Sequence, residues 1–198
     1  MNPELPQFAA IIVAGGAGTR LSGVSKPELM IAGRSLIERT LDACLGASHV
    51  VIVGGEHLRR RDALWACEDP PGSGPAAGLC AGLAALDAAG DVSPLVLVLG
   101  TDMPHAQFGA AVLLERARDG ADGADGAWMV DSSGIAQPLL AVYRRHVIAA
   151  RCASDAGPGA SLRRVTGGLD MIAVEDVHDA SRDVDTWEDV EYWEGKLS

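Results

Sequence analysis

Apolar residues gather in short continuous runs along the chain instead of alternating with polar residues. Continuous apolar character predicts strands that are covered on both faces, as in a parallel sheet with helices on either side. The clearest runs lie at 8–13 (FAAIIV), 49–53 (HVVIV), 95–99 (LVLVL), 139–143 (LLAVY) and 171–174 (MIAV), and weaker candidates lie at 64–67 and 127–130.

Helix signals fill the gaps between these runs. Ser35-x-x-Glu38 and Thr186-x-x-Asp189 both have the capping-box pattern that starts a helix. Strands that alternate with helices predict an α/β fold, here a three-layer α/β/α domain with a Rossmann-like, mostly parallel sheet. The expected helices lie at 35–46, 75–90, about 105–119, about 143–153 and 186–195.

Composition limits the class of protein. The 198 residues are 48% hydrophobic, which suffices for one sizeable core, and without a linker or repeat we expect a single domain over 1–198. The formal charge of −11 argues against a general affinity for nucleic acid or for anionic membranes. Basic residues at a site must therefore be placed locally.

Cysteine usage and the first residues indicate a reducing compartment. The four cysteines include no C-x-x-C pair, so neither a disulfide nor a metal cluster is expected. The start "MNPELPQFAA" lacks a basic segment followed by an apolar core, and no apolar stretch reaches the roughly 20 residues of a membrane span. These features predict a soluble cytoplasmic protein.

A glycine-rich loop follows the first predicted strand, in "IIVAGGAGTRLSGVSKPEL" (11–29). It fits neither a Walker A loop, which needs Gly-Lys-Ser/Thr, nor a dinucleotide fingerprint, whose third glycine would be Leu21. Small residues allow backbone N–H groups to wrap a triphosphate, and Arg20 and Lys26 would add positive charge. The alternative is a plain turn with two solvated basic residues.

Asp102 is the strongest single-residue candidate for a metal ligand. Two residues separate it from the strand predicted at 95–99, so its carboxylate should lie at the carboxyl edge of the sheet, beside the glycine loop. Carboxylates are the ligands that Mg²⁺ prefers, usually together with substrate phosphates. The alternative role for Asp102 is to cap the helix that follows.

Nucleophilic side chains are not indicated. The five histidines have no spacing that makes a metal site or a catalytic pair, and Ser22, Ser25 and Ser73 have no adjacent general base. A reaction whose nucleophile belongs to the substrate fits this pattern better.

Five segments carry a resemblance that spans almost the whole chain. The chain resembles the nucleotidyltransferase superfamily that makes nucleoside-diphosphate conjugates, in particular its molybdenum cofactor guanylyltransferases. Lys26-Pro27 and the absence of an acidic residue at Ser25 are closer to the sugar-nucleotide pyrophosphorylases, and Trp187 replaces a usual proline. The segments are "IIVAGGAGTRLSGVSKPELMIAGRSLIERTL" (11–41), "EDPPGSGPAAGLCAGLAAL" (68–86), "LVLVLGTDMP" (95–104), "AQPLLAVYR" (136–144) and "DVDTWEDVE" (183–191).

The resemblance implies a site and a reaction. The expected enzyme would use Mg²⁺ to join GMP from GTP to molybdopterin or the molybdenum cofactor, with release of pyrophosphate. An NTP-binding half at about 1–104 and an acceptor-binding half at about 105–198 would share the work, with transient contacts to cofactor-biosynthesis or acceptor proteins. The expected residues are Arg20, Lys26 and Asp102 for catalysis; Ala14, Gly15, Gly16, Gly18, Lys26, Asp69, Gly74 and Gly78 for the nucleotide; Asp102 and Asp185, or Asp183 in its place, for the metal; and Gln137 for the acceptor.

Two alternatives stay open at this point. One is a cytidylyltransferase that acts on the molybdenum cofactor or on another small phosphate, such as a sugar phosphate or phospholactate. The other is a nucleotide-binding paralogue without turnover, although the joint presence of Arg20, Lys26 and Asp102 argues against it.

Overall fold

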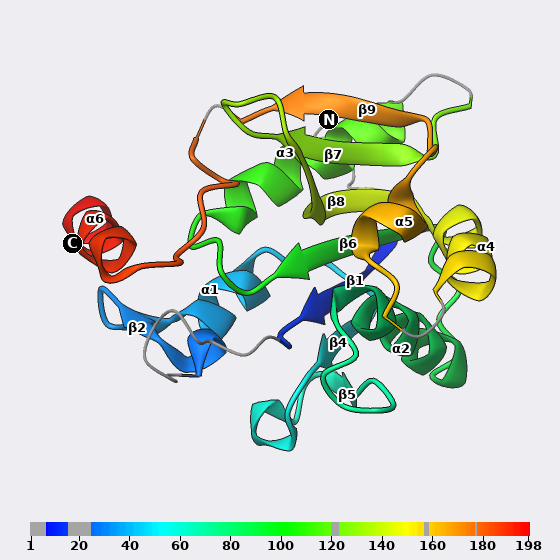
Figure 1. Ribbon diagram of the computed structural model, residues 1–198, viewed down its shortest axis with the longest axis horizontal. Coiled ribbons are helices and arrows are strands. Elements are labelled where there is room, and N and C mark those ends of the chain that lie inside the picture. The colour runs from blue at the N-terminus through cyan, green and yellow to red at the C-terminus, as the bar shows by residue number, and fades with distance from the viewer. Residues whose placement is uncertain (1–6, 16–24, 120–122, 157–158, 177) are drawn as a thin grey trace.

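One sheet of seven strands organises the chain (Figure 1). The computed structural model describes residues 7–15, 25–119, 123–156, 159–176 and 178–198. The strands stand in the order β5-β4-β1-β6-β8-β7-β9. They are β1 (Phe8–Val13), β4 (Val50–Val53), β5 (Leu64–Ala66), β6 (Leu95–Gly100), β7 (Gly126–Val130), β8 (Ala136–Arg144) and β9 (Met171–Glu175).

The sheet is mostly parallel, as the continuous apolar runs predict. Strands β1, β4, β5 and β6 run parallel to one another, and β9 runs parallel to β7. Strand β8 is antiparallel to both of its neighbours, β6 and β7. All seven predicted strands are present, and every residue of β1 and β6 is buried, because helices cover both faces there.

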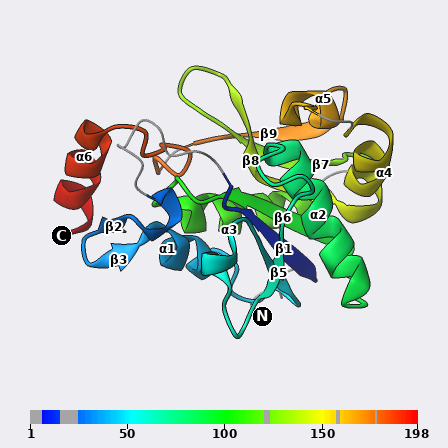
Figure 2. The same ribbon diagram turned by 60° about the horizontal axis from the view of Figure 1, so that its bottom comes forward.

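Helices cover the two faces of the sheet (Figure 2). The face with α1 and α3 is opposite the face with α2, α4 and α5. All five predicted helices form, and both capping boxes are made, by Ser35 with Glu38 and by Thr186 with Asp189. Helix α5 was not predicted. The helices are α1 (Leu36–Asp42), α2 (Pro75–Ala88), α3 (Ala106–Asp119), α4 (Arg145–Asp155), α5 (Leu162–Thr166) and α6 (Trp187–Leu197).

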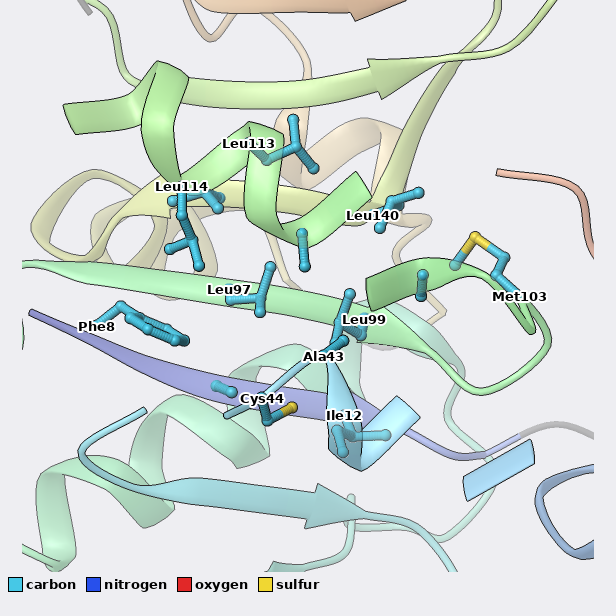
Figure 3. Close-up of a cluster of buried hydrophobic side chains, with 14 of the residues drawn as sticks. Phe8, Ile12, Ala43, Cys44, Leu97, Leu99, Met103, Leu113, Leu114 and Leu140 are labelled. Carbon is cyan, nitrogen blue, oxygen red and sulfur yellow. The ribbon is translucent and has the colours of Figure 1, made fainter. Parts of the chain in front are cut away.

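The core under α1 and α3 is built from aliphatic residues of the central strands (Figure 3). Leu97 and Leu99 of β6 belong to one buried cluster with Leu113 and Leu114 of α3 and with Phe8 of β1. Each of these side chains is at most 2% exposed. Burying one such side chain contributes about 1.5–3 kcal/mol, so this cluster fixes the central strands on which the site depends.

On the opposite face, glycines let α2 approach β1 closely. A Cβ added at Gly78 would lie 3.2 Å from Cγ1 of Val13, and one added at Gly82 would lie 2.6 Å from Cγ2 of Ile11. Gly74 stands just before α2 with φ +94°, which side chains rarely adopt. Gly78 therefore permits close packing of α2 on β1, and Gly74 is required by its backbone conformation, while the roles of both in nucleotide binding stay predictions.

A third cluster attaches α6 to a small hairpin that was not predicted. The hairpin pairs β2 (Met30–Ile31) with β3 (Arg34–Ser35), and it follows the one-turn 3₁₀ helix η2 (Lys26–Glu28). Trp193 of α6 is fully buried against Ile31 and Val184. A second 3₁₀ turn, η3, spans Glu56–Leu58. Among the helices that the structure describes, none combines the length and apolar character needed to cross a membrane.

Candidate nucleotide and metal site

The site forms where two central parallel strands end side by side. Strands β1 and β6 are neighbours, and the chain leads from β1 to β4 on one side and from β6 to β7 on the other, so the two connections leave in opposite directions. Val13, the last residue of β1, pairs with Gly100, the last residue of β6. The loop that begins at Ala14 and the turn that holds Asp102 therefore leave the sheet together, at the position where α/β sheets bind ligands.

Lys26 lies between two carboxylates at this edge. Its Nζ donates to Oδ1 of Asp185 at 2.6 Å and to Oδ2 of Asp102 at 3.4 Å. Its side chain is only 20% exposed. Desolvation lowers the pKa of Lys26, but the hydrogen bond to Asp185 and the negative charges of Asp102 and Asp185 outweigh it, so the pKa is raised. The ammonium group is therefore charged throughout the physiological range.

The segment before α6 is docked onto the turn after β6. The backbone N–H of Val184 donates to the carbonyl oxygen of Asp102 at 2.8 Å, and the Val184 side chain is buried. This bond places Asp183 and Asp185 on either side of the attachment point. Asp102, Asp183 and Asp185 each offer a carboxylate oxygen, and these three atoms lie within 4.8 Å of one another.

The three carboxylates are a candidate cation site by their chemistry. An all-oxygen donor set of this size fits Mg²⁺, which takes one or two protein carboxylates together with phosphate oxygens. Partial desolvation raises the pKa of Asp183, and the charges of Asp185 and Asp102 raise it further. Among the described residues, the cluster has three carboxylates and one ammonium group. It contains both aspartates between which the sequence left the choice open.

The alternative role of Asp102 as a helix cap finds no support in the described residues. Its carboxylate faces Lys26 and accepts no backbone N–H among them. Gly100 gives that carboxylate its room, because a Cβ at Gly100 would lie 2.8 Å from Oδ1 of Asp102. Sequence reasoning missed Gly100, although a glycine that ends a buried strand two residues before a candidate ligand was a usable signal.

The first two residues of the glycine-rich loop, Ala14 and Gly15, lie where a binding loop is expected, directly after β1 at the carboxyl edge of the sheet. Ala14 continues the pairing of β1, since its N–H donates to the carbonyl of Val53 at 2.8 Å, and Gly15 follows it on the surface. Gly16, Gly18 and Arg20 lie outside the described residues. Their roles in binding phosphate stay predictions.

The loop between β5 and α2 holds a second carboxylate next to the expected Asp69. Asp69 is exposed, whereas the neighbouring Glu68 is buried. Oε1 of Glu68 accepts the N–H of Gly72 at 3.1 Å, and it lies 3.4 Å from where a Cβ at Gly15 would be. Glu68 is therefore a described carboxylate next to Gly15, and its position two residues after the end of β5 was the missed signal, while the role of Asp69 stays a prediction.

Gln137 lies in the same cavity as the carboxylate cluster. This cavity has a volume of about 650 Å³ and is bordered by Asp102 and Asp183 on one side and by Gln137 on another. Nε2 of Gln137 donates to Oδ2 of Asp131 at 2.9 Å, so the amide is held in a fixed position. The acceptor role of Gln137 stays a prediction, but the position agrees with it.

One serine does have a histidine neighbour, contrary to expectation. Oγ of Ser25 lies 3.4 Å from Nε2 of His57, and Oε2 of Glu28 lies 3.7 Å from the same nitrogen. A nucleophile, a base and an orienting acid would need both ring nitrogens of the histidine. The cluster is therefore no catalytic triad.

Solved structures share this fold over nearly the entire chain. Molybdopterin-guanine dinucleotide biosynthesis protein A from Archaeoglobus fulgidus superimposes with a TM-score of 0.71 and 21% identity, covering 96% of this chain and 98% of that one. The 2-C-methyl-D-erythritol 4-phosphate cytidylyltransferase of Thermus thermophilus gives a TM-score of 0.67 and 16% identity, covering 94% and 97%. The fold is thus one that nucleotidyltransferases use.

Sequence comparison gives the family. The model of the MobA-like NTP transferase domain matches residues 10–171. A probable molybdenum cofactor guanylyltransferase from Natronomonas pharaonis is 32% identical over 95% of this chain and 97% of its own length. A molybdenum cofactor guanylyltransferase from Acidiphilium cryptum is 34% identical over 53% of this chain and 55% of its own. The chain belongs to the MobA-like family and is a nucleotidyltransferase.

Proposed function

We propose that this nucleotidyltransferase joins GMP from GTP to a phosphate of molybdopterin or the molybdenum cofactor, with Mg²⁺ bound and pyrophosphate released. The observation that carries the proposal is the meeting of Lys26 with Asp102, Asp183 and Asp185 where β1 and β6 end. The full-length similarity to a probable molybdenum cofactor guanylyltransferase supports the choice of acceptor and base.

The reaction needs alignment and charge compensation rather than a protein nucleophile. A phosphate oxygen of the acceptor attacks the α-phosphorus of GTP, and a new P–O bond forms there. The bond from that phosphorus to the bridging oxygen breaks, and pyrophosphate leaves with the electron pair. Because the attacking oxygen is already anionic, correct placement of two polyanions accounts for much of the acceleration.

The carboxylate cluster would hold the metal. Asp102 and Asp185, with Asp183 beside them, present oxygens close enough together to share one cation. Mg²⁺ bound there would offset the charge that develops on the phosphate oxygens during transfer. Docking of Val184 on Asp102 keeps these side chains together before substrate binds.

Lys26 would change partners when substrate binds. It pairs with Asp185 and Asp102 in this structure, where its ammonium compensates part of their charge. Once that charge is met by a metal cation, Lys26 can donate instead to oxygens of the α-phosphate. Arg20 would meet the departing phosphates in the same way.

Pyrophosphate release with each nucleoside triphosphate, with and without molybdopterin, tests the proposal. We expect release only when Mg²⁺, molybdopterin and GTP are all present, and turnover with CTP or UTP at least tenfold slower, because buried groups that pair one base leave another unsatisfied. Equal or faster turnover with CTP would exclude the guanylyl assignment and leave the reaction class standing.

The metal is tested with Asp102→Asn, which keeps the size of the side chain and removes its charge. Activity should fall steeply at limiting Mg²⁺ and recover in part at high Mg²⁺ or with Mn²⁺. Asp62→Asn, an exposed aspartate outside the cluster, is the matched control and should leave the rate unchanged. Unchanged activity of Asp102→Asn at limiting Mg²⁺ would remove the metal from this position.

A further inference from the structure

The cavity next to the carboxylate cluster is large enough for the body of an acceptor molecule. Its volume of about 650 Å³ is within the range of small-molecule sites. Its described lining comes from the turn after β6, from the β7–β8 connection with the start of β8, and from the segment between β9 and α6, with one residue each from α5 and α6. Because Asp102 and Asp183 belong to the lining, a molecule in the cavity would be in contact with the reaction centre.

Half of the acidic residues in the described lining, Asp131, Asp176 and Asp189, already accept backbone N–H groups. Asp131 accepts from Ser133 and Ile135 at 2.8 and 3.0 Å. Asp176 accepts from the backbone of Ala180 and Ser181 at 2.9 and 2.7 Å. Their charges shape turns, and their oxygens are taken. The cavity is nevertheless negative in sum, so an anionic ligand needs a cation to enter it.

Arg182 supplies that cation. Among the described residues that line the cavity, it carries the only positive charge. Its guanidinium carbon stands 3.6 Å from the ring centroid of Tyr192, close enough for a strong cation–π contact. One terminal nitrogen lies 3.5 Å from Oδ1 of Asp189, which is a long ion pair.

The donors of Arg182 are positioned but unused. Within the described part of the chain, its guanidinium makes an ion pair and a stacking contact but no hydrogen bond. Asp189 is itself fixed, because its other oxygen closes the capping box of α6 on Thr186. The segment before α6 thus carries a planar fork of N–H donors, oriented by Tyr192 and Asp189 of α6, at the wall of a cavity that is also lined by Asp102 and Asp183.

We propose that this cavity is the acceptor subsite and that the guanidinium of Arg182 binds a phosphate monoester group of the acceptor. The inference rests on the proposed function and adds the residue that selects for a phosphorylated acceptor. A guanidinium fork binds two phosphate oxygens at once, which a point charge does not. Arg182 would contact the acceptor directly, on the phosphate group whose oxygen attacks, and would hold that group without exchanging a proton with it.

The test compares the KM for molybdopterin in Arg182→Gln, Arg182→Lys and the matched control Lys196→Gln. Lys196 also faces Tyr192, at 5.6 Å from its ring centroid, and pairs with Asp179, but it does not line the cavity. Arg182→Gln should raise the KM for molybdopterin at least tenfold and change the KM for GTP less than twofold. Arg182→Lys should restore part of the loss, and Lys196→Gln should move neither KM.

Other outcomes overturn the assignment. An unchanged KM for molybdopterin in Arg182→Gln, or equal changes in the two KM values, would show that Arg182 does not select the acceptor. If the circular dichroism of Arg182→Gln shows that this variant is not folded, Arg182→Lys replaces it in the test. The KM of Arg182→Lys for molybdopterin should still exceed that of the wild type. A Lys196→Gln variant with the same defect would assign the effect to the packing of α6.

Failure of the proposed function is a separate result. If the wild-type protein releases no pyrophosphate from GTP with molybdopterin, Arg182 is tested by broadening of the ³¹P signal of inorganic phosphate in the presence of saturating GTP. The broadening should be lost in Arg182→Gln and kept in Lys196→Gln. Equal broadening in the wild type and Arg182→Gln would overturn the phosphate role of Arg182 independently.

Discussion

Two clusters of charged side chains lie at opposite edges of the same sheet. At the amino edge, Asp91 is 1% exposed and accepts hydrogen bonds from His49 at 2.7 Å, from the N–H of Ser93 at 2.9 Å and from Arg145 at 2.6 Å. Burial raises the pKa of Asp91, but the hydrogen bonds from Ser48, His49 and Ser93 outweigh it and hold the pKa well below its usual range.

At the carboxyl edge the balance is different. Three aspartates share one lysine among the described residues, and the pKa of Asp183 is raised rather than lowered. Both clusters use the same residue types and join distant parts of the chain. At the amino edge the hydrogen bonds to Asp91 stabilise the fold, and at the carboxyl edge, where three described carboxylates face one ammonium group, we propose that a cation and its substrate bind.

Lys26→Ala should give the largest difference between the loss of activity and the loss of stability. Because Lys26 is half-buried at an edge that does not form the core, we expect kcat/KM to fall by roughly two orders of magnitude or more, with a loss of less than about 1 kcal/mol in stability. Steady-state pyrophosphate release and urea unfolding measure the two effects. A collapse of stability with full activity in the remaining folded enzyme would make Lys26 a structural residue.

Asp91→Ala should lower the stability of the fold and leave substrate binding unchanged. It leaves Arg145 and the N–H of Ser93 without their partner, so we expect a loss of about 3 kcal/mol in the free energy of unfolding and an unchanged KM for GTP.

The contribution of Asp91 to stability should depend on pH. Since the pKa of Asp91 is lowered by folding, its contribution is fully present above the unfolded value of about 3.9 and is lost as the pH falls through the folded value. Urea unfolding between pH 3 and pH 7 should therefore show the difference between wild type and Asp91→Asn shrinking below about pH 4.

Gly100→Ala tests the position of the Asp102 carboxylate at the carboxyl edge of the sheet. The added Cβ must displace the Asp102 carboxylate, whose Oδ1 would be 2.8 Å away, while Leu139 at 3.6 Å tolerates it. We expect the Mg²⁺ concentration for half-maximal rate to rise by about tenfold, a change worth about 1.4 kcal/mol, with a melting temperature close to that of the wild type. Gly195→Ala, where nothing lies within 4 Å, is the matched control.

The smallest expected effect is a gain in stability from a substitution at the carboxyl edge, whereas Asp91→Ala at the amino edge should cause a loss. Asp183→Asn removes a charge that its neighbours Asp185 and Asp102 repel, so it should stabilise the metal-free protein by up to about 1 kcal/mol. The same change should weaken the thermal stabilisation by Mg²⁺. Thermal unfolding with and without Mg²⁺ tests this pair of results, and a lower melting temperature in the metal-free variant would contradict the surplus of negative charge.

The sequence predicted the parts of the fold that depend on long apolar runs. Strands such as β6 are buried along their whole length, and the capping boxes of α1 and α6 are local hydrogen-bond patterns. The hairpin of β2 and β3 has only two residues in each strand, and helix α5 has five, so neither leaves a readable period. The turn of the β2–β3 hairpin is made by Ala32 and Gly33, both with positive φ, and it lacks the usual Asn-Gly or Asp-Gly signal.

The site was predictable where position along a strand decides it. Lys26 and Asp102 could be expected together because each follows a strand that ends at the carboxyl edge. The surroundings of these residues depend on contacts between distant segments: Val184 docks on Asp102, Glu68 lies by Gly15, and Arg182 stacks on Tyr192. Such contacts have no period or spacing in one sequence, so only the structure shows them.

The bond between Lys26 and Asp185 joins residues that are 159 positions apart. During synthesis, Lys26 and the strands around it leave the ribosome long before Asp183, Val184 and Asp185 exist. The sheet can assemble through β9 while the carboxylate cluster still lacks two of its three aspartates. A growing chain can therefore complete its sheet before it completes the proposed cation site, and an unfinished chain would lack two of the carboxylates proposed to bind the metal.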